Sequence, residues 1–146
     1  MLKAVLVLSA VYLAAVGLML MAFPLQFGIG AVPADAGPEL VALLRLLGGP
    51  FLGIAVLNWL VRDAEASPVL RAVVAANVVG FGAVAANDVW GVVSGEAREI
   101  AKVFLVVHLG FAGAFAVVLW RGKCRRWRRT GPLRRLRRHL PLAEED

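Results

Sequence analysis

Hydrophobic residues fill four long stretches of the chain, and short polar segments separate them. A helix needs roughly 20 apolar residues to cross the hydrocarbon core of a bilayer, and each stretch approaches that length. The apolar residues do not alternate with polar ones, and Ala and Leu are frequent, which indicates helices rather than strands. The pattern predicts four membrane-spanning helices, at about residues 3–23, 40–61, 69–93 and 100–120.

Two other interpretations of these stretches are open. The first stretch has small residues at Ala14 and Ala15, as a cleaved signal peptide would. It is longer than the roughly 7–15 apolar residues of a signal peptide, however, so we favour an uncleaved span. The stretches are also compatible with buried helices of a soluble protein, but four of them would leave almost no polar surface. We therefore expect an all-α fold, an integral membrane four-helix bundle over residues 1–120.

Composition supports a membrane protein and excludes other classes. Hydrophobic residues make up 60% of the 146 residues, charged residues only 18%, and the mean hydropathy is +0.78. Soluble domains carry about 45–50% apolar and about 25% charged residues. A large soluble enzyme and a disordered chain are both excluded. The single cysteine, Cys124, excludes a disulfide within one chain.

Positive charge is concentrated at the C-terminal end. Residues 1–120 carry six Lys or Arg and seven Asp or Glu, a net charge of −1, whereas residues 121–146 carry ten and three, a net charge of +7. Basic clusters next to a span are attracted to anionic lipid, by about 1 kcal/mol per basic residue. We expect a short amphipathic segment between Pro132 and Pro141. The arginines expected to bind anionic lipid headgroups are Arg125, Arg126, Arg128, Arg129, Arg134, Arg135, Arg137 and Arg138.

This basic tail has two competing interpretations. The same charge is explained if the tail only fixes the orientation of the spans in the membrane. Basic tails also bind nucleic acid, but a tail tethered within a few residues of the bilayer meets lipid first, so nucleic acid is a disfavoured partner.

The distribution of Lys and Arg predicts the orientation of the spans. The two loops at residues 24–39 and 94–99 contain one basic residue, Arg98. The opposite side holds the tail and three further basic residues, Lys3, Arg62 and Arg71. Cytoplasmic segments carry the excess of Lys and Arg, so both termini are expected in the cytoplasm. The Ala, Val, Gly and Arg-rich composition favours a bacterium with GC-rich DNA as the source.

Ionisable side chains inside the spans are the candidate site, because such groups are costly in lipid and mark function by default. Arg45, Asp88 and Lys102 come from three different spans. They fall at a similar depth near the extracytoplasmic surface, where opposite charges can neutralise one another. Asn77 shares a helix face with Asp88, and we expect that face to point inward. The candidate cluster is Arg45, Asp88, Lys102, Asn77 and His108.

Purely structural roles also remain open for these residues. Arg45 and Lys102 lie close enough to the interface to snorkel, or to form a purely structural ion pair. His108 is either a core histidine bonded to a carbonyl or part of a quinone or proton site. Asn58 and Asn87 are expected to form interhelical hydrogen bonds. No metal-ligand spacing is visible, and we expect no metal, no cofactor and no catalytic residue.

Small residues are expected to hold the helices together, because close packing drives helix association in lipid. Gly49 and Gly53 form a GxxxG spacing in the second span. The neighbouring Gly48-Gly49-Pro50 run favours a kink, since proline removes a backbone donor. Further packing candidates in the third and fourth spans are Gly80, Gly82, Gly110 and Gly113.

Three motifs resemble those of small DoxX-like bacterial inner-membrane proteins. They are LVLSAVYLAAVGL in the first span, the Phe23-Pro24 exit, and LLRLLGGPFLGIAVLNWL with its Arg45. The resemblance covers roughly residues 3–120 and implies a four-helix bundle, usually without an assigned activity. A few proteins of that kind are linked to quinone-dependent sulfur oxidation. No residue here maps onto such an activity, and the basic tail is not part of the pattern.

Three functions follow as hypotheses. The first is a structural or accessory membrane protein without catalysis of its own, packing with itself or with a partner subunit. The second is a binding or redox-accessory protein that holds a lipophilic, quinone-like ligand near Arg45, Asp88 and His108. The third is a small transporter or proton pathway through the same cluster; no inverted repeat supports it.

Overall fold

The computed structural model describes the backbone of residues 1–30 and 32–130, with side chains as far as Arg121. The regular structure of this part of the chain is all helical, joined by loops; it contains no strand, only an isolated bridge between Ile29 and Val32. The elements are α1 (Leu2–Ala22), α2 (Pro24–Phe27), α3 (Pro38–Leu60), α4 (Pro68–Ser94) and α5 (Ala101–Thr130).

Within the described residues, four of these helices are long and apolar enough to cross a membrane, in agreement with the predicted number of spans. In α5 the apolar part is Ala101–Arg121, and the helix continues to Thr130. The first ten residues of the predicted tail therefore prolong α5. The predicted amphipathic segment from Pro132 to Pro141 lies outside the described residues.

Local sequence signals set the helix ends. Proline occupies the first position of α2, α3 and α4, where its missing N–H costs nothing and its fixed φ suits a helix. The Ser67 hydroxyl caps α4 by accepting the Leu70 backbone N–H at 3.1 Å. At the other end, Gly95 has a φ of 75° and ends α4 in the left-handed conformation that glycine adopts without strain.

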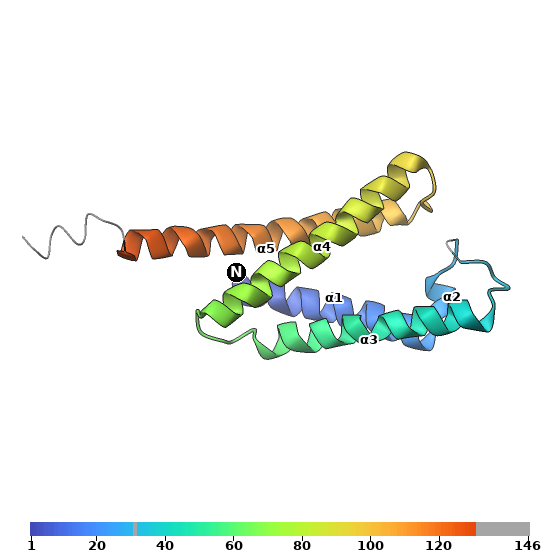
Figure 1. Ribbon diagram of the computed structural model, residues 1–146, viewed down its shortest axis with the longest axis horizontal. Helices are drawn as coiled ribbons and strands as arrows, with labels where there is room; N and C mark the ends of the chain where they lie inside the picture. The colour runs from blue at the N-terminus through green and yellow to red at the C-terminus, as the bar shows by residue number, and fades with distance from the viewer. Residues whose placement is uncertain (31, 131–146) are drawn as a thin grey trace, which may run out of the picture.

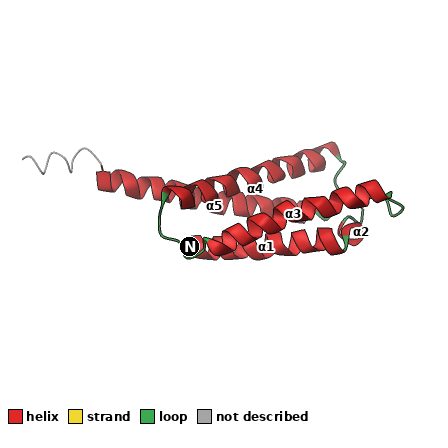
Figure 2. Ribbon diagram, turned by 60° about the horizontal axis from the view of Figure 1, so that its bottom comes forward, coloured by secondary structure: helices red, strands yellow, loops and turns green. Residues whose placement is uncertain are grey.

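The helices form two antiparallel pairs (Figures 1 and 2). The most extensive contacts are those of α1 with α3 and of α4 with α5. The N-terminus, the loop after α3 and the far end of α5 lie at one end of the molecule. We call this the terminal end. The α2 segment and the loop between α4 and α5 lie at the other, here the loop end.

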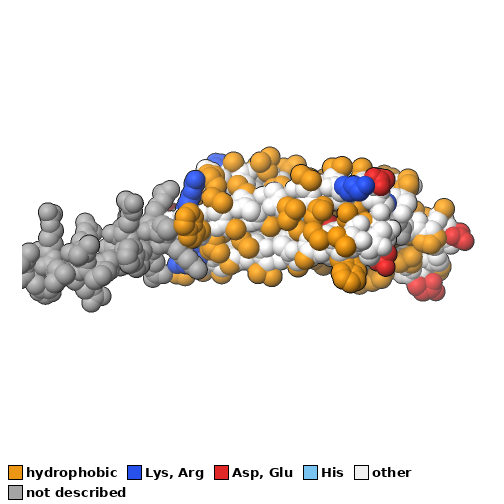
Figure 3. Space-filling view, turned by 90° about the horizontal axis from the view of Figure 1, so that it is seen from above, with side chains coloured by type: hydrophobic (Ala, Val, Ile, Leu, Met, Phe, Trp, Pro, Cys, Tyr) orange, Lys and Arg blue, Asp and Glu red, His pale blue; other side chains and the backbone are white. Residues whose placement is uncertain are grey.

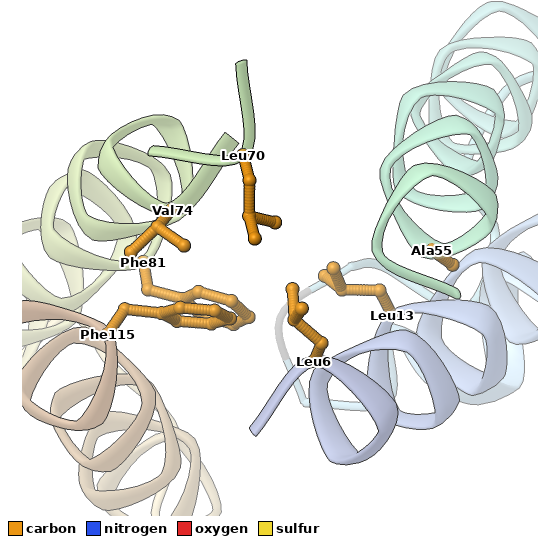
Figure 4. Packing of buried hydrophobic residues seen from close by; sticks show 7 residues of the cluster. All are labelled: Leu6, Leu13, Ala55, Leu70, Val74, Phe81 and Phe115. Carbon is orange, nitrogen blue, oxygen red and sulfur yellow. The ribbon is translucent and has the colours of Figure 1, made fainter. Parts of the chain in front are cut away.

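Apolar side chains from both pairs meet in the middle of the molecule (Figure 4). Leu6 and Leu13 of α1 point toward Leu70 and Phe81 of α4, beside Phe115 of α5. Many large hydrophobic side chains are exposed on the long helices. On the face that Figure 3 shows, they are spread between the two ends, and charged side chains lie toward the ends. Such a surface suits hydrocarbon rather than water.

The closest approach of α1 and α3 is made by two glycines. A Cβ on Gly17 would lie 2.9 Å from the Gly48 carbonyl oxygen, and a Cβ on Gly48 would lie 2.7 Å from the Gly17 carbonyl oxygen. Both backbones therefore require glycine here.

The predicted glycine contacts in α3, α4 and α5 are wrong for packing within the chain. A Cβ on Gly49 or Gly53 would meet no other atom within 4 Å. The spacing is present, but these residues face away from α1. A Cβ on Gly80, Gly82, Gly110 or Gly113 would likewise meet no other atom within 4 Å.

An ion pair joins the N-terminus to the loop after α3. Lys3 Nζ lies 2.6 Å from Asp63 Oδ1, and Arg62 Nε lies 3.4 Å from Asp63 Oδ2. The hydrogen bond from Lys3 is the main cause that lowers the pKa of Asp63 below its ordinary value. Lys3 and Asp63 are exposed and Arg62 is half-buried, so the pair contributes little to stability.

Candidate functional site

A hydrogen-bonded triad from three helices lies within the apolar part of the molecule. The Tyr12 hydroxyl of α1 lies 2.7 Å from His108 Nε2 of α5, and His108 Nδ1 lies 2.5 Å from Asp88 Oδ2 of α4. The side chains of His108 and Asp88 are only 12% and 15% exposed. The triad thus connects the two helix pairs.

The protons of the triad follow from its chemistry. An ionised carboxylate only accepts hydrogen bonds, so His108 Nδ1 donates to Asp88. In the neutral imidazole Nε2 then accepts the Tyr12 O–H, and in the imidazolium it donates to the Tyr12 oxygen instead. The His108 ring therefore lies between a carboxyl group and a phenol, with one ring nitrogen bonded to each. This arrangement can donate or accept a hydrogen bond, or move a proton, on the loop-end side of the core.

Aromatic rings surround the triad. Phe104, His108, Phe111 and Phe115 recur at intervals of three and four residues and so share one face of α5. The ring of Phe104 stacks on His108 at 6.2 Å between centroids, and Phe81 of α4 stacks on Phe111 at 4.8 Å. The polar triad is consequently set in an aromatic environment.

A cavity of about 410 Å³ opens beside the triad, with Tyr12, Asp88 and His108 in its wall. Ligand pockets in proteins are about 300–1,000 Å³ and are mostly apolar with a few convergent polar groups. The wall also includes Phe27, Phe104 and Trp90 as aromatic surfaces, and Asn87 and Glu96 as further polar groups. The cavity is large and polar enough for a small head group.

Arg98 joins the two loops at the loop end. Its guanidinium donates to the Phe27 carbonyl oxygen at 3.0 Å and also to the Ile29 carbonyl oxygen. Next to this contact, Gly30 has a φ of 79°, the left-handed conformation, and the position of its missing Cβ lies 3.7 Å from Arg98. Arg98 lines the cavity as well, so this contact forms part of its loop-end wall.

The structure separates the charged residues that the sequence placed at one depth. Lys102 Nζ pairs with Glu99 one turn away, at 2.8 Å, on the exposed surface. Arg45 is exposed on α3 and has no hydrogen bond or ion pair to any side chain that the structure describes. Of the predicted cluster, only Asp88 and His108 are in contact. The expected mutual neutralisation of Arg45, Asp88 and Lys102 is absent from the described part of the chain.

Asn77 belongs to a second buried polar group, the amide node, which comprises Ser9, Asn58 and Asn77. The two amides exchange hydrogen bonds of 2.9 Å in both directions, and Asn58 also donates to Ser9 Oγ at 3.1 Å. The second Asn77 hydrogen goes to the Val73 carbonyl oxygen. The interhelical hydrogen bond predicted for Asn58 is confirmed. Asn87 forms none with the described residues and faces the cavity instead.

Sequence reasoning missed Tyr12 and Arg98 as site residues. Tyr12 is the only tyrosine of the chain and lies within an apolar span, and a buried phenol usually requires a partner. That signal was available. Nothing in the sequence indicated that Arg98 reaches across to the α2 segment, because that contact joins residues about 70 positions apart.

No group of three His, Cys, Asp or Glu side chains is close enough to hold a metal ion within the described ranges. Comparisons with known protein families, with curated proteins and with solved structures give no match to this chain. The chemistry of the site is therefore inferred from its own residues.

Proposed function

We propose that this chain is a small membrane protein, without catalysis of its own, that binds a lipophilic ligand with a quinone-like head group. The observation that carries the proposal is the Tyr12–His108–Asp88 triad, which lies in the wall of an aromatic-lined cavity between apolar helices. A quinone head group is flat, stacks on aromatic rings and accepts hydrogen bonds at its carbonyl oxygens. The Asn87 amide supplies matching donors, and so does the Tyr12 O–H when the imidazolium form of His108 donates to the Tyr12 oxygen.

The identity of the molecule that copurifies with the protein tests this proposal. The full chain is extracted in mild detergent, and bound small molecules are identified by mass spectrometry. We expect one lipophilic compound with a polar ring at near-equal molar amount. Recovery of bulk lipid alone, in the proportions of the membrane, would contradict the proposal.

A pair of variants in α5 provides the control. His108→Leu removes both hydrogen bonds of the triad, and we expect at least a fivefold loss of the copurified compound. Gly113→Ala lies on the same helix, outside the cavity, where a Cβ meets nothing within 4 Å. It should retain the compound. Equal amounts of the compound in both variants would show that the triad does not bind it.

The membrane setting is part of the same proposal. The four apolar helices would cross a bacterial inner membrane as a bundle, with both termini in the cytoplasm. Lys3, Arg62 and Arg71 near the terminal end, together with the basic charge of residues 121–146, support this orientation through the positive-inside rule. The basic segment would bind anionic lipid headgroups. The likeness to DoxX-like proteins, carried by the motifs around Tyr12 and Arg45, is compatible with this setting.

A structural or accessory role is the second candidate, and one observation favours it. Four glycines of α3 and α5 leave open surface, since a Cβ on Gly49, Gly53, Gly110 or Gly113 would meet nothing within 4 Å. Such surface suits a second copy or a partner subunit. A single monomeric species in mild detergent, with no copurifying protein, would count against this role. Transport ranks last; equal ion flux in liposomes for the parent and Asp88→Asn would remove it.

A further inference from the structure

We propose that the ligand is an amphiphile whose apolar tail occupies a second cavity, between α3 and α4, which opens sideways to the bilayer. The inference rests on the proposed function, because it takes the head group to lie at the Tyr12–His108–Asp88 triad. It adds a ligand class, a lipid-like molecule with a long tail, and a route of access from within the membrane.

The second cavity has the chemistry of a tail site. Its volume is about 370 Å³, and its wall is apolar except for Asn77 and His108. The Asn77 amide hydrogens are already bonded to Asn58 and Val73, so this group offers no free donor. A chain of methylene or isoprene units matches such a wall, because it leaves no polar atom without a partner.

The two cavities adjoin. Phe51, Val84 and His108 line both of them. His108 therefore borders both the polar cavity and the apolar one. We infer that the tail of a ligand whose head group lies at His108 passes these shared residues into the second cavity.

The second cavity faces the lipid side of the molecule. Three residues of its α3 wall are also exposed on the outer surface: Leu47 at 46%, Ile54 at 43% and Leu57 at 42%. The helix pairing explains this opening, since α3 packs mainly on α1 and α4 mainly on α5. Pro50 lies in the same wall, inside α3, and cannot donate a backbone hydrogen bond to Leu46. The seam between α3 and α4 is thus left less tightly packed.

Photolabelling with a tailed probe tests the route. The probe is an alkyl p-benzoquinone with a diazirine at the end of its tail, added to the full chain in lipid nanodiscs. Excess unlabelled alkyl quinone distinguishes bound probe from probe dissolved in lipid. We expect the competitor to lower labelling of the Leu47–Leu57 segment of α3 at least threefold. Competable labelling confined to other outer surfaces would overturn the inference.

Two glycines of α4 give a matched pair of variants. Gly80 lines the second cavity and Gly82 lines neither cavity, and a Cβ on either would meet nothing within 4 Å. Gly80→Leu fills the tail site, and we expect it to abolish the competable labelling, whereas Gly82→Leu retains it. Ala76→Leu, in the same wall, repeats the test should Gly80→Leu fail to fold. Unchanged labelling in folded Gly80→Leu or Ala76→Leu would overturn the inference.

The outcomes separate the two proposals. A probe with the diazirine on its quinone ring reports the head-group site independently. Competable ring labelling near Tyr12 that is lost in His108→Leu, but with no competable tail labelling in the α3–α4 seam, would retain the proposed function and reject the tail site. Absence of competable labelling with both probes would reject both.

Discussion

At the scale of single residues, the amide node is the most completely bonded polar group in the core. Both hydrogens of each amide have acceptors, and both carbonyl oxygens accept a hydrogen bond. Ser9 and Asn58 are fully buried. A buried polar group that is left without a partner destabilises the fold by more than the net contribution of one hydrogen bond. The node therefore fixes the position of α4 against α1 and α3.

Replacing only one of the two amides should leave the other without its partner and so cost stability. We expect Asn77→Leu to lower the free energy of unfolding by about 1–2 kcal/mol, the upper range for polar contacts between membrane helices. The double variant Asn58→Leu, Asn77→Leu should lose less than the sum of the single changes, because neither amide is then left unbonded. Denaturation in mixed micelles followed by circular dichroism measures these differences.

Asn87→Leu is the control for this series. Asn87 lies on the same helix but is exposed and bonds to no described residue, so its loss should change stability little. A cost for Asn77→Leu no larger than that for Asn87→Leu would show that the node does not stabilise the fold.

At the scale of helices, two different contacts form the two pairs. The α1–α3 pair depends on the backbone approach at Gly17 and Gly48. The α4–α5 pair depends on ring packing, with Phe81 stacked on Phe111 and, at 6.0 Å, on Phe115. Backbone contact tolerates no side chain, whereas ring packing tolerates changes of similar volume.

Neighbouring glycines of α3 test the first contact. We expect Gly48→Ala to lower the free energy of unfolding by about 1–3 kcal/mol, as overpacking does, because its methyl group would press on the Gly17 carbonyl. Gly49→Ala has open space and should be neutral or stabilising by up to about 1 kcal/mol, since alanine favours a helix. Equal effects at both positions, measured by thermal unfolding in detergent, would contradict the assigned contact.

At the scale of the whole molecule, an even number of crossings leaves both ends of the described chain at the terminal end (Figure 1). The triad, its cavity and Arg98 lie toward the opposite, loop end. With the orientation proposed above, the ligand head group lies in the outer half of the bilayer. The tail cavity lies closer to the terminal end, because Ile54 and Leu57 of its wall belong to the second half of α3 and Ala76 and Asn77 to the first half of α4.

Cysteine accessibility tests this orientation. In a Cys124→Ser background, Ala34→Cys places a thiol in the loop before α3 and Ala66→Cys places one in the loop after α3; both alanines are exposed. A membrane-impermeant maleimide should label the first variant in intact cells and the second only after permeabilisation. The reverse pattern would show that the orientation is opposite to the proposed one. Labelling of both variants in intact cells would show that α3 does not cross the membrane.

The positions of the four long helices were decided by the sequence alone. The length of an apolar run is a local property, and so are the proline and serine signals at helix starts such as Ser67-Pro68. The depth of Asp88 along its helix followed in the same way. The sequence also indicated that Asn58 would bond to another helix, because an amide within an apolar span needs a partner.

Which polar residues meet was decided only by the tertiary structure. Depth fixes one coordinate of a side chain, while the rotation of each helix and the choice of neighbours fix the others. These placed His108, rather than Arg45 or Lys102, against Asp88, and brought Tyr12 to the other side of the imidazole. They also turned Gly49 and Gly53 outward and set Gly48 against Gly17. A spacing in the sequence gives the relative faces of residues on one helix, but only packing decides which face finds a partner.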